Sequence, residues 1–233
     1  MQVRAVLFDK DGTLFAFGAT WGRWAAELVI GLAQGDRALA RHLGRAVGFD
    51  LETQTFEAHG VAAAGTVEEI ARAFAPILGQ PVERLNDKIT ALSATVQAVP
   101  AVPLRPLLGA LSARGLKLGL ATNDVEASAR AQLEAADVSH LFDFIAGYDS
   151  GFGAKPAPDM CLAFAEALRI EARHVVMVGD SLHDLLAGRA AGMATVGVLS
   201  GVATEAELRP FADVVLPDIS ALPLWLETGR EPF

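Results

Sequence analysis

Short apolar runs alternate with helix-like stretches along most of the 233-residue chain, and this alternation restricts the fold more than any other feature. The runs are short and rich in β-branched residues, which favours buried strands over buried helices. The expected strands are Val3–Phe8, Lys117–Ala121, Phe142–Ala146, His174–Val178, Thr195–Val198 and Asp213–Leu216. Strands that alternate with helices pair in parallel, and helices then cover both faces of the sheet. The sequence therefore predicts an α/β fold built on a parallel sheet.

Residues 17–100 lack this alternation and predict several amphipathic helices instead. One of these helices follows a capping box formed by Thr66 and Glu69. We expect an all-helical domain at residues 17–100, inserted into a core domain made of residues 1–16 and 101–233. The segment 17–100 is called the insert below.

Composition excludes several classes of partner. The chain has 28 acidic and 19 basic residues, a net charge of −9. Nucleic acids and anionic membranes attract clustered basic residues, so neither is expected as the main partner. The single cysteine, Cys161, excludes an intramolecular disulfide and is expected to be a small buried apolar side chain. No apolar run reaches bilayer length and no signal sequence is evident, so we expect a cytoplasmic protein. We also expect it to be a monomer or a small homo-oligomer.

Polar motifs follow the expected strands at the sheet edge where α/β proteins bind their ligands. The first holds Asp9 and Asp11, whose side chains point the same way on an extended backbone. The others are Thr122-Asn123, Lys155 in the loop before a helix, and Gly179-Asp180-Ser181-Leu182-His183-Asp184. Each motif alone is also explained as a helix cap, an acidic turn or a surface lysine.

Together the motifs predict a site for phosphoryl chemistry. Several carboxylates at one sheet edge repel one another unless a cation balances them. Mg²⁺ is a hard cation that commonly uses few carboxylates together with waters and a substrate phosphate. A carboxylate can also act as a nucleophile.

These four motifs, in this order, resemble those of the haloacid dehalogenase superfamily, and the insert resembles the cap of its phosphoglycolate phosphatase-like branch. The resemblance implies a Rossmann-like core and a Mg²⁺-dependent phosphatase of small phosphorylated metabolites, with phosphoglycolate as the leading substrate. It implies that Asp9 attacks phosphorus and forms an aspartyl-phosphate. Asp11 would protonate the leaving oxygen and then activate the hydrolytic water.

The resemblance also implies roles for the remaining motif residues. The side chains of Asp9 and Asp180, with the backbone carbonyl of Asp11, would hold Mg²⁺. The phosphoryl oxygens would be bound by Thr122, Asn123 and Lys155. Support would come from Ser181 and from Asp184, which would orient Lys155 or a water on the metal.

The sequence departs from the family pattern at two places. Lys10 replaces a residue that is usually apolar, and Phe15-Ala16-Phe17 stands where many members have an Asp-Ser pair. The core chemistry survives both changes, whereas the substrate becomes less certain. Asp11 favours phosphate esters over halo-acids, because a halide needs no protonation. A sugar-phosphate mutase and a catalytically silent phosphate-ligand binding protein stay open as alternatives.

Several residues of the insert could select the substrate. Trp21 and Trp24 either line a pocket or pack the first helix, and the segment 49–57 could reach the site. Possible partners for a substrate carboxylate are Arg23, Arg37, Arg41, Arg45, Arg72 and Arg84. In the core, His183 could touch the site, but we expect it to face solvent.

Overall fold

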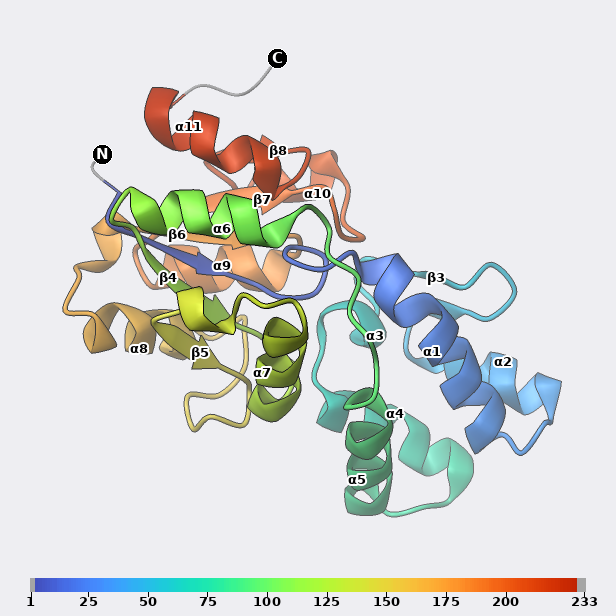
Figure 1. The fold of residues 1–233 in the computed structure, drawn as a ribbon. Helices are drawn as coiled ribbons and strands as arrows, with labels where there is room; N and C mark the ends of the chain where they lie inside the picture. Colours follow the sequence, from blue (N-terminus) through green and yellow to red (C-terminus); the bar gives the residue numbers. More distant parts are fainter. Residues whose placement is uncertain (1–2, 230–233) are drawn as a thin grey trace.

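The computed structural model describes residues 3–229, and its largest element is a parallel six-stranded sheet (Figure 1). The strands are β1 (Ala5–Phe8), β4 (Lys117–Ala121), β5 (Phe144–Ala146), β6 (Val175–Gly179), β7 (Ala194–Val198) and β8 (Val214–Leu216). Their order across the sheet is β5-β4-β1-β6-β7-β8, and every pairing is parallel. The predicted α/β fold and each expected strand are confirmed, with strand bounds shifted by at most two residues.

Helices cover both faces of this sheet because successive residues of a strand point to opposite faces. In β1, Val6 and Phe8 pack in one apolar cluster and Ala5 and Leu7 in another, and all four are fully buried. The core helices are α6 (Leu104–Ala113), α7 (Glu126–Ala135), α8 (Asp159–Ala167), α9 (Leu182–Ala190), α10 (Glu205–Leu208) and α11 (Leu222–Thr228). Short 3-10 turns lie at Ser139–Leu141, Ala172–His174 and Ile219–Ala221.

Most core helices pack on one face of the sheet, as their membership of one of the two apolar clusters shows. Helices α6, α7 and α11 contribute to the cluster of Val6, whereas α8 and α9 contribute to that of Leu7. Cys161 of α8 is fully buried in this second cluster, and burial raises the pKa of its thiol to about 12. Cys161 is therefore a packing residue, as expected.

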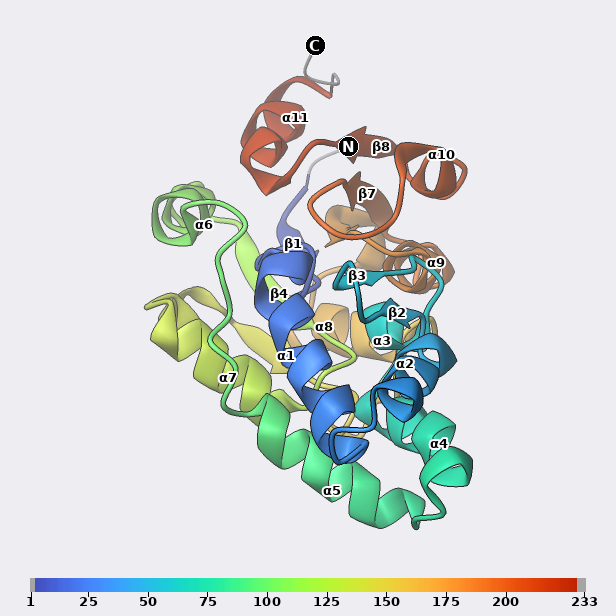
Figure 2. The same cartoon turned by 90° about the vertical axis from the view of Figure 1, so that its right-hand side faces the viewer.

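The insert has its own elements and its own apolar core. They are α1 (Phe17–Leu32), α2 (Arg37–Ala46), β2 (Phe49–Asp50), β3 (Thr55–Phe56), α3 (Val61–Ala64), α4 (Val67–Leu78) and α5 (Val82–Ser93). Phe49, Phe74 and Leu85 are fully buried members of an apolar cluster that contains residues of the insert alone. This separate core supports the proposed division of the chain at residues 16/17 and 100/101. The turned view in Figure 2 shows α4 and α5 at the opposite end of the molecule from α11.

The insert is not entirely helical, which corrects one expectation. β2 and β3 form a two-stranded antiparallel ribbon between α2 and α3. The Asp50 carboxylate accepts hydrogen bonds from the backbone N–H groups of Glu52 and Thr53, which fixes the turn. The predicted capping box at Thr66 and Glu69 is present and begins α4.

Within residues 3–229, no helix combines the length and the apolar character that crossing a lipid bilayer requires.

Candidate active site

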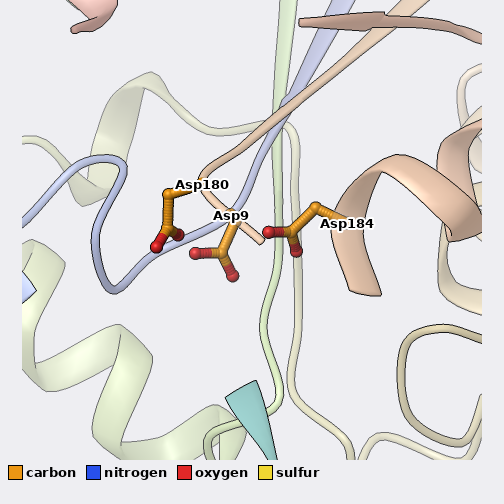
Figure 3. A group of neighbouring side chains, drawn as sticks. All are labelled: Asp9, Asp180 and Asp184. Carbon is orange, nitrogen blue, oxygen red and sulfur yellow. The ribbon is translucent and has the colours of Figure 1, made fainter. Parts of the chain in front are cut away.

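Three aspartates meet at the carboxyl edge of the sheet (Figure 3). β1 and β6 are parallel neighbours with Phe8 opposite Val178, so Asp9 and Asp180 follow these strands side by side. Asp184 enters from the first turn of α9. Oxygen atoms of the three carboxylates lie within 4.8 Å of one another, and all three residues are buried.

A single ammonium group lies among these carboxylates. Lys155 Nζ is 2.5 Å from Asp9 Oδ1 and 2.5 Å from Asp184 Oδ1. Burial lowers the pKa of Lys155, but the charges of Asp184 and Asp9 raise it more, so the group stays protonated. One positive charge thus lies among three buried carboxylates and pairs directly with two of them, Asp9 and Asp184.

The pKa values of two of these carboxylates are raised. Burial raises the pKa of Asp9 to about 7, against the opposing effect of Lys155. Burial and the neighbouring charges of Asp9 and Asp184 raise the pKa of Asp180 well above its usual range. The ionised form of the site therefore needs a further cation.

The donor set and the backbone around Asp180 fit a hard divalent ion. Carboxylate oxygens are the ligands that Mg²⁺ prefers. Two glycines make room for the Asp180 carboxylate: a Cβ added at Gly201 would lie 1.7 Å from Asp180 Oδ2, and one at Gly12 would lie 2.3 Å from it. This close approach of the backbone fixes the carboxylate beside Asp9.

Asp184 is less available as a ligand than Asp9 and Asp180. Its Oδ1 accepts from Lys155, while its Oδ2 accepts from the Ser181 backbone N–H at 3.0 Å and from the Ser181 hydroxyl at 2.7 Å. The bond from the Ser181 backbone N–H and a return bond from the Asp184 backbone N–H to the Ser181 hydroxyl oxygen form a capping box at the start of α9. Asp184 and Ser181 therefore position Lys155 and the strand end.

Asp11 lies beside this cluster and is held by two donors. Lys10 Nζ is 2.7 Å from Asp11 Oδ2, and the Trp21 indole N–H donates to Asp11 Oδ1 at 2.7 Å. Trp21 belongs to α1, so the insert contacts the site directly. The side chain of Asp11 is not in the group of three converging carboxylates, which leaves its backbone carbonyl for the expected metal contact.

Lys10 organises a buried polar network that the sequence did not reveal. It is fully buried, and its Nζ also contacts Asp124 Oδ2 at 3.0 Å and Gln132 Oε1 at 2.5 Å. Burial lowers the pKa of Lys10, and the charges of Asp11 and Asp124 raise it more. The only signal in the sequence was a lysine at a place that is usually apolar.

The expected phosphate ligands lie at the same edge but differ in availability. Thr122 is buried and lines the cavity, with its hydroxyl accepting from the Asp124 backbone N–H at 3.1 Å. The Asn123 side chain is instead bound to the backbone of Lys155. Its Oδ1 accepts from the Lys155 N–H at 2.9 Å, and its Nδ2 donates to the carbonyl oxygens of Lys155, at 3.0 Å, and of Ala64. This geometry makes Asn123 a positioning residue for the Lys155 loop.

His183 does not face solvent, contrary to expectation. Its Nδ1 lies 2.9 Å from the carbonyl oxygen of Ala64, and the residue is half-buried. Ala64 ends α3, so Asn123 and His183 both contact the same carbonyl of the insert.

The site opens into a cavity of about 110 Å³ between the sheet edge and the insert. The polar wall is formed by the residues described above, including Asp9, Lys155 and Asp180. The facing wall comes from α1, β2, β3, α3 and α4, and from Ser93 at the end of α5. Both Phe49 and Phe56 line it, so the 49–57 segment does reach the site.

Comparisons with known proteins agree with this geometry. The family model of haloacid dehalogenase-like hydrolases matches residues 3–192. A phosphoglycolate phosphatase of Rhodospirillum rubrum is 32% identical over 226 residues, which cover 96% of this chain and 90% of that protein. A Dickeya dadantii protein named "Probable phosphatase IndB" is 37% identical over 63% of this chain and 68% of its own.

A solved structure shows the same fold. A haloacid dehalogenase-like protein of Bacteroides fragilis superposes with a TM-score of 0.73 at 20% identity, covering 95% of this chain and all of that one.

Proposed function

Because the chain belongs to the haloacid dehalogenase-like hydrolases and is a phosphoric monoester hydrolase, we propose that it removes the phosphoryl group from a small phosphorylated metabolite by way of Asp9. The observation that supports this most is the buried group of Asp9, Asp180 and Asp184 around Lys155. The family uses a divalent metal, and we propose Mg²⁺ for this chain.

The proposed reaction begins at Asp9. A carboxylate oxygen of Asp9 forms a bond to phosphorus while the ester P–O bond breaks, which gives an aspartyl-phosphate and a leaving oxygen. Lys155, 2.5 Å from Asp9 Oδ1, holds the carboxylate and supplies positive charge for the phosphoryl oxygens. Held by Asp9, Asp180 and the Asp11 backbone carbonyl, Mg²⁺ would supply the positive charge that keeps Asp9 ionised.

Asp11 moves the protons in both halves of the proposed reaction. Its carboxyl group gives a proton to the leaving oxygen, which departs as an alcohol. The resulting carboxylate then takes a proton from a water that attacks phosphorus, releasing inorganic phosphate and restoring Asp9. The hydrogen bond from Trp21 and the ion pair with Lys10 hold the Asp11 carboxylate, the form that takes the proton from the water.

The first substrate to test is phosphoglycolate, because the Rhodospirillum rubrum relative bears that name over nearly the whole chain. Release of inorganic phosphate separates a phosphatase from a mutase, since a mutase returns the phosphoryl group to its substrate. Binding of phosphate analogues without turnover would instead indicate a silent binding protein.

The deciding experiment measures inorganic phosphate released from a panel of phosphorylated metabolites. It is run with Mg²⁺, with chelator, and with Asp9→Asn. We expect release that needs the metal and that falls by about a thousandfold or more in the variant. Full turnover by Asp9→Asn would contradict the assignment of the nucleophile.

A further inference from the structure

The wall of the cavity that faces the carboxylates is apolar and aromatic apart from Ser93, whose hydroxyl donates to the Thr90 carbonyl. It is lined by Trp21 and Trp24 of α1, Phe49 and Phe56 of the ribbon, and Ile70 and Phe74 of α4. The rings of Trp21 and Trp24 meet edge-to-face at 5.1 Å, and those of Phe49 and Phe56 lie 4.8 Å apart. Aromatic walls of this kind favour apolar and especially ring-shaped groups.

The same wall offers no cation to a substrate carboxylate. Among the cavity-lining residues that the structure describes, the basic side chains are Lys155 and His183 alone. Lys155 is held between Asp9 and Asp184, and His183 contacts the Ala64 carbonyl.

The arginines of the insert lie elsewhere. All six, and Lys88 with them, are exposed and absent from the described cavity lining. Arg23, Arg41 and Arg72 are paired on the surface with Glu27, Glu52 and Glu68, respectively. A carboxylate bound against the insert would therefore be desolvated without a partner, which is costly.

Trp21 lines this wall and also contacts a proposed catalytic residue, because its indole N–H donates to Asp11. An apolar group that packs on Trp21 therefore lies beside the proposed proton donor. The cavity volume of about 110 Å³ is below the roughly 150 Å³ of an apolar cavity that binds benzene, so it limits the alcohol part to a single ring at most.

We propose that the substrate is a phosphate monoester whose alcohol part is uncharged, apolar and no larger than a single ring. This inference rests on the proposed phosphatase activity. It places phosphoglycolate, whose alcohol part carries a carboxylate, among the poor substrates.

The test compares esters whose leaving alcohols have similar reactivity. We expect kcat/KM for benzyl phosphate to exceed that for ethyl phosphate and that for phosphoglycolate by more than tenfold. Aryl phosphates are left out because their better leaving groups raise rates without specific binding. A preference for phosphoglycolate would overturn this inference and leave the phosphatase proposal intact.

A matched pair of variants locates the preference in the cavity. Ile70→Arg places a cation on the apolar wall, and Leu92→Arg places one on the exposed surface of α5. We expect Ile70→Arg to shift the ratio of kcat/KM toward phosphoglycolate by tenfold or more, and Leu92→Arg to leave the ratio unchanged. An equal effect of both variants would contradict the proposal.

Binding to Asp9→Asn separates recognition from turnover. Trp21 and Trp24 line the cavity, so quenching of tryptophan fluorescence reports binding there. We expect benzyl phosphate to bind at least tenfold more tightly than phosphoglycolate. If no ester releases phosphate from the wild-type protein, the phosphatase proposal fails, and this binding ratio still decides the inference: equal affinities would refute it.

Discussion

Lys10 is a fully buried ammonium group shared by Asp11, Asp124 and Gln132. An ion pair in such a place stabilises little by itself, but removing one partner leaves buried charges without compensation. We therefore expect Lys10→Met to lower the free energy of unfolding by about 3–5 kcal/mol and to reduce kcat, because Asp11 loses its fixed position. Urea denaturation and phosphate release measure the two effects.

The matched control is Lys88→Met, which changes an exposed lysine of α5. A surface change of this kind moves stability by about 0.5 kcal/mol or less. Similar losses from both variants would show that the Lys10 network does not fix Asp11.

Asp9 makes the stability of the metal-free protein depend on pH. Its pKa of about 7 in the folded protein lies above the ordinary value of 3.8. The folded state therefore binds more protons than the unfolded state between these values, so stability rises as pH falls through about 7. In chelator, we expect Tm to be higher at pH 6 than at pH 8.

Asp9→Asn removes this titration and serves as the comparison, with a smaller rise in Tm expected between the same two pH values. The exposed acids Asp50 and Glu207 do not titrate between pH 6 and pH 8, because backbone hydrogen bonds lower their pKa values. They therefore do not contribute to the difference in Tm. A rise of equal size in the variant would refute the role of Asp9.

At the scale of elements, the loop after β7 fits closely against the end of β6. A Cβ at Gly201 would lie 1.7 Å from Asp180 Oδ2, so Gly201→Ala must displace that carboxylate. Changes to groups that orient metal ligands commonly weaken metal affinity by about 10–100-fold. We expect at least the lower end of this range for Mg²⁺, measured by calorimetric titration.

Gly109→Ala is the control, because Gly109 lies within α6 and no atom would meet an added Cβ there. Alanine in a helix is favoured over glycine by about 1 kcal/mol, so this variant should be slightly more stable and bind the metal normally. Unchanged metal affinity in Gly201→Ala would mean that the carboxylate tolerates displacement.

Sequence patterns predicted elements well where they rest on local chemistry. The strands that precede Asp9 and Asp180, and the capping box at Thr66, depend on apolar runs and neighbouring residues. The ribbon of β2 and β3 was missed, because a ladder of two residues leaves no recognisable alternation. The contacts of Lys10 with Gln132, and of Asn123 with Ala64, were missed because they join residues distant in the chain.

At the scale of the whole molecule, stability and metal binding oppose each other at the sheet edge. Asp180 is buried beside Asp9 and Asp184, and its raised pKa shows that its charge is disfavoured there. We expect Asp180→Asn to raise Tm in chelator, because it removes this repulsion. In the wild-type protein, saturating Mg²⁺ should raise Tm by mass action, and the variant should lose this increase.

Asp87→Asn, at an exposed position of α5, should leave both Tm values near those of the wild-type protein. A lower Tm of Asp180→Asn in chelator would show that the carboxylate stabilises the fold even without metal.

The burial of Cys161 leaves the described surface without a reactive thiol. The exposed side chains Leu92 of the insert and Leu186 of the core lie on the two proposed domains. Replacing both by cysteine would give a pair of maleimide attachment points on an otherwise inert background. A fluorophore pair at these positions would then report the distance between insert and core during turnover, one molecule at a time.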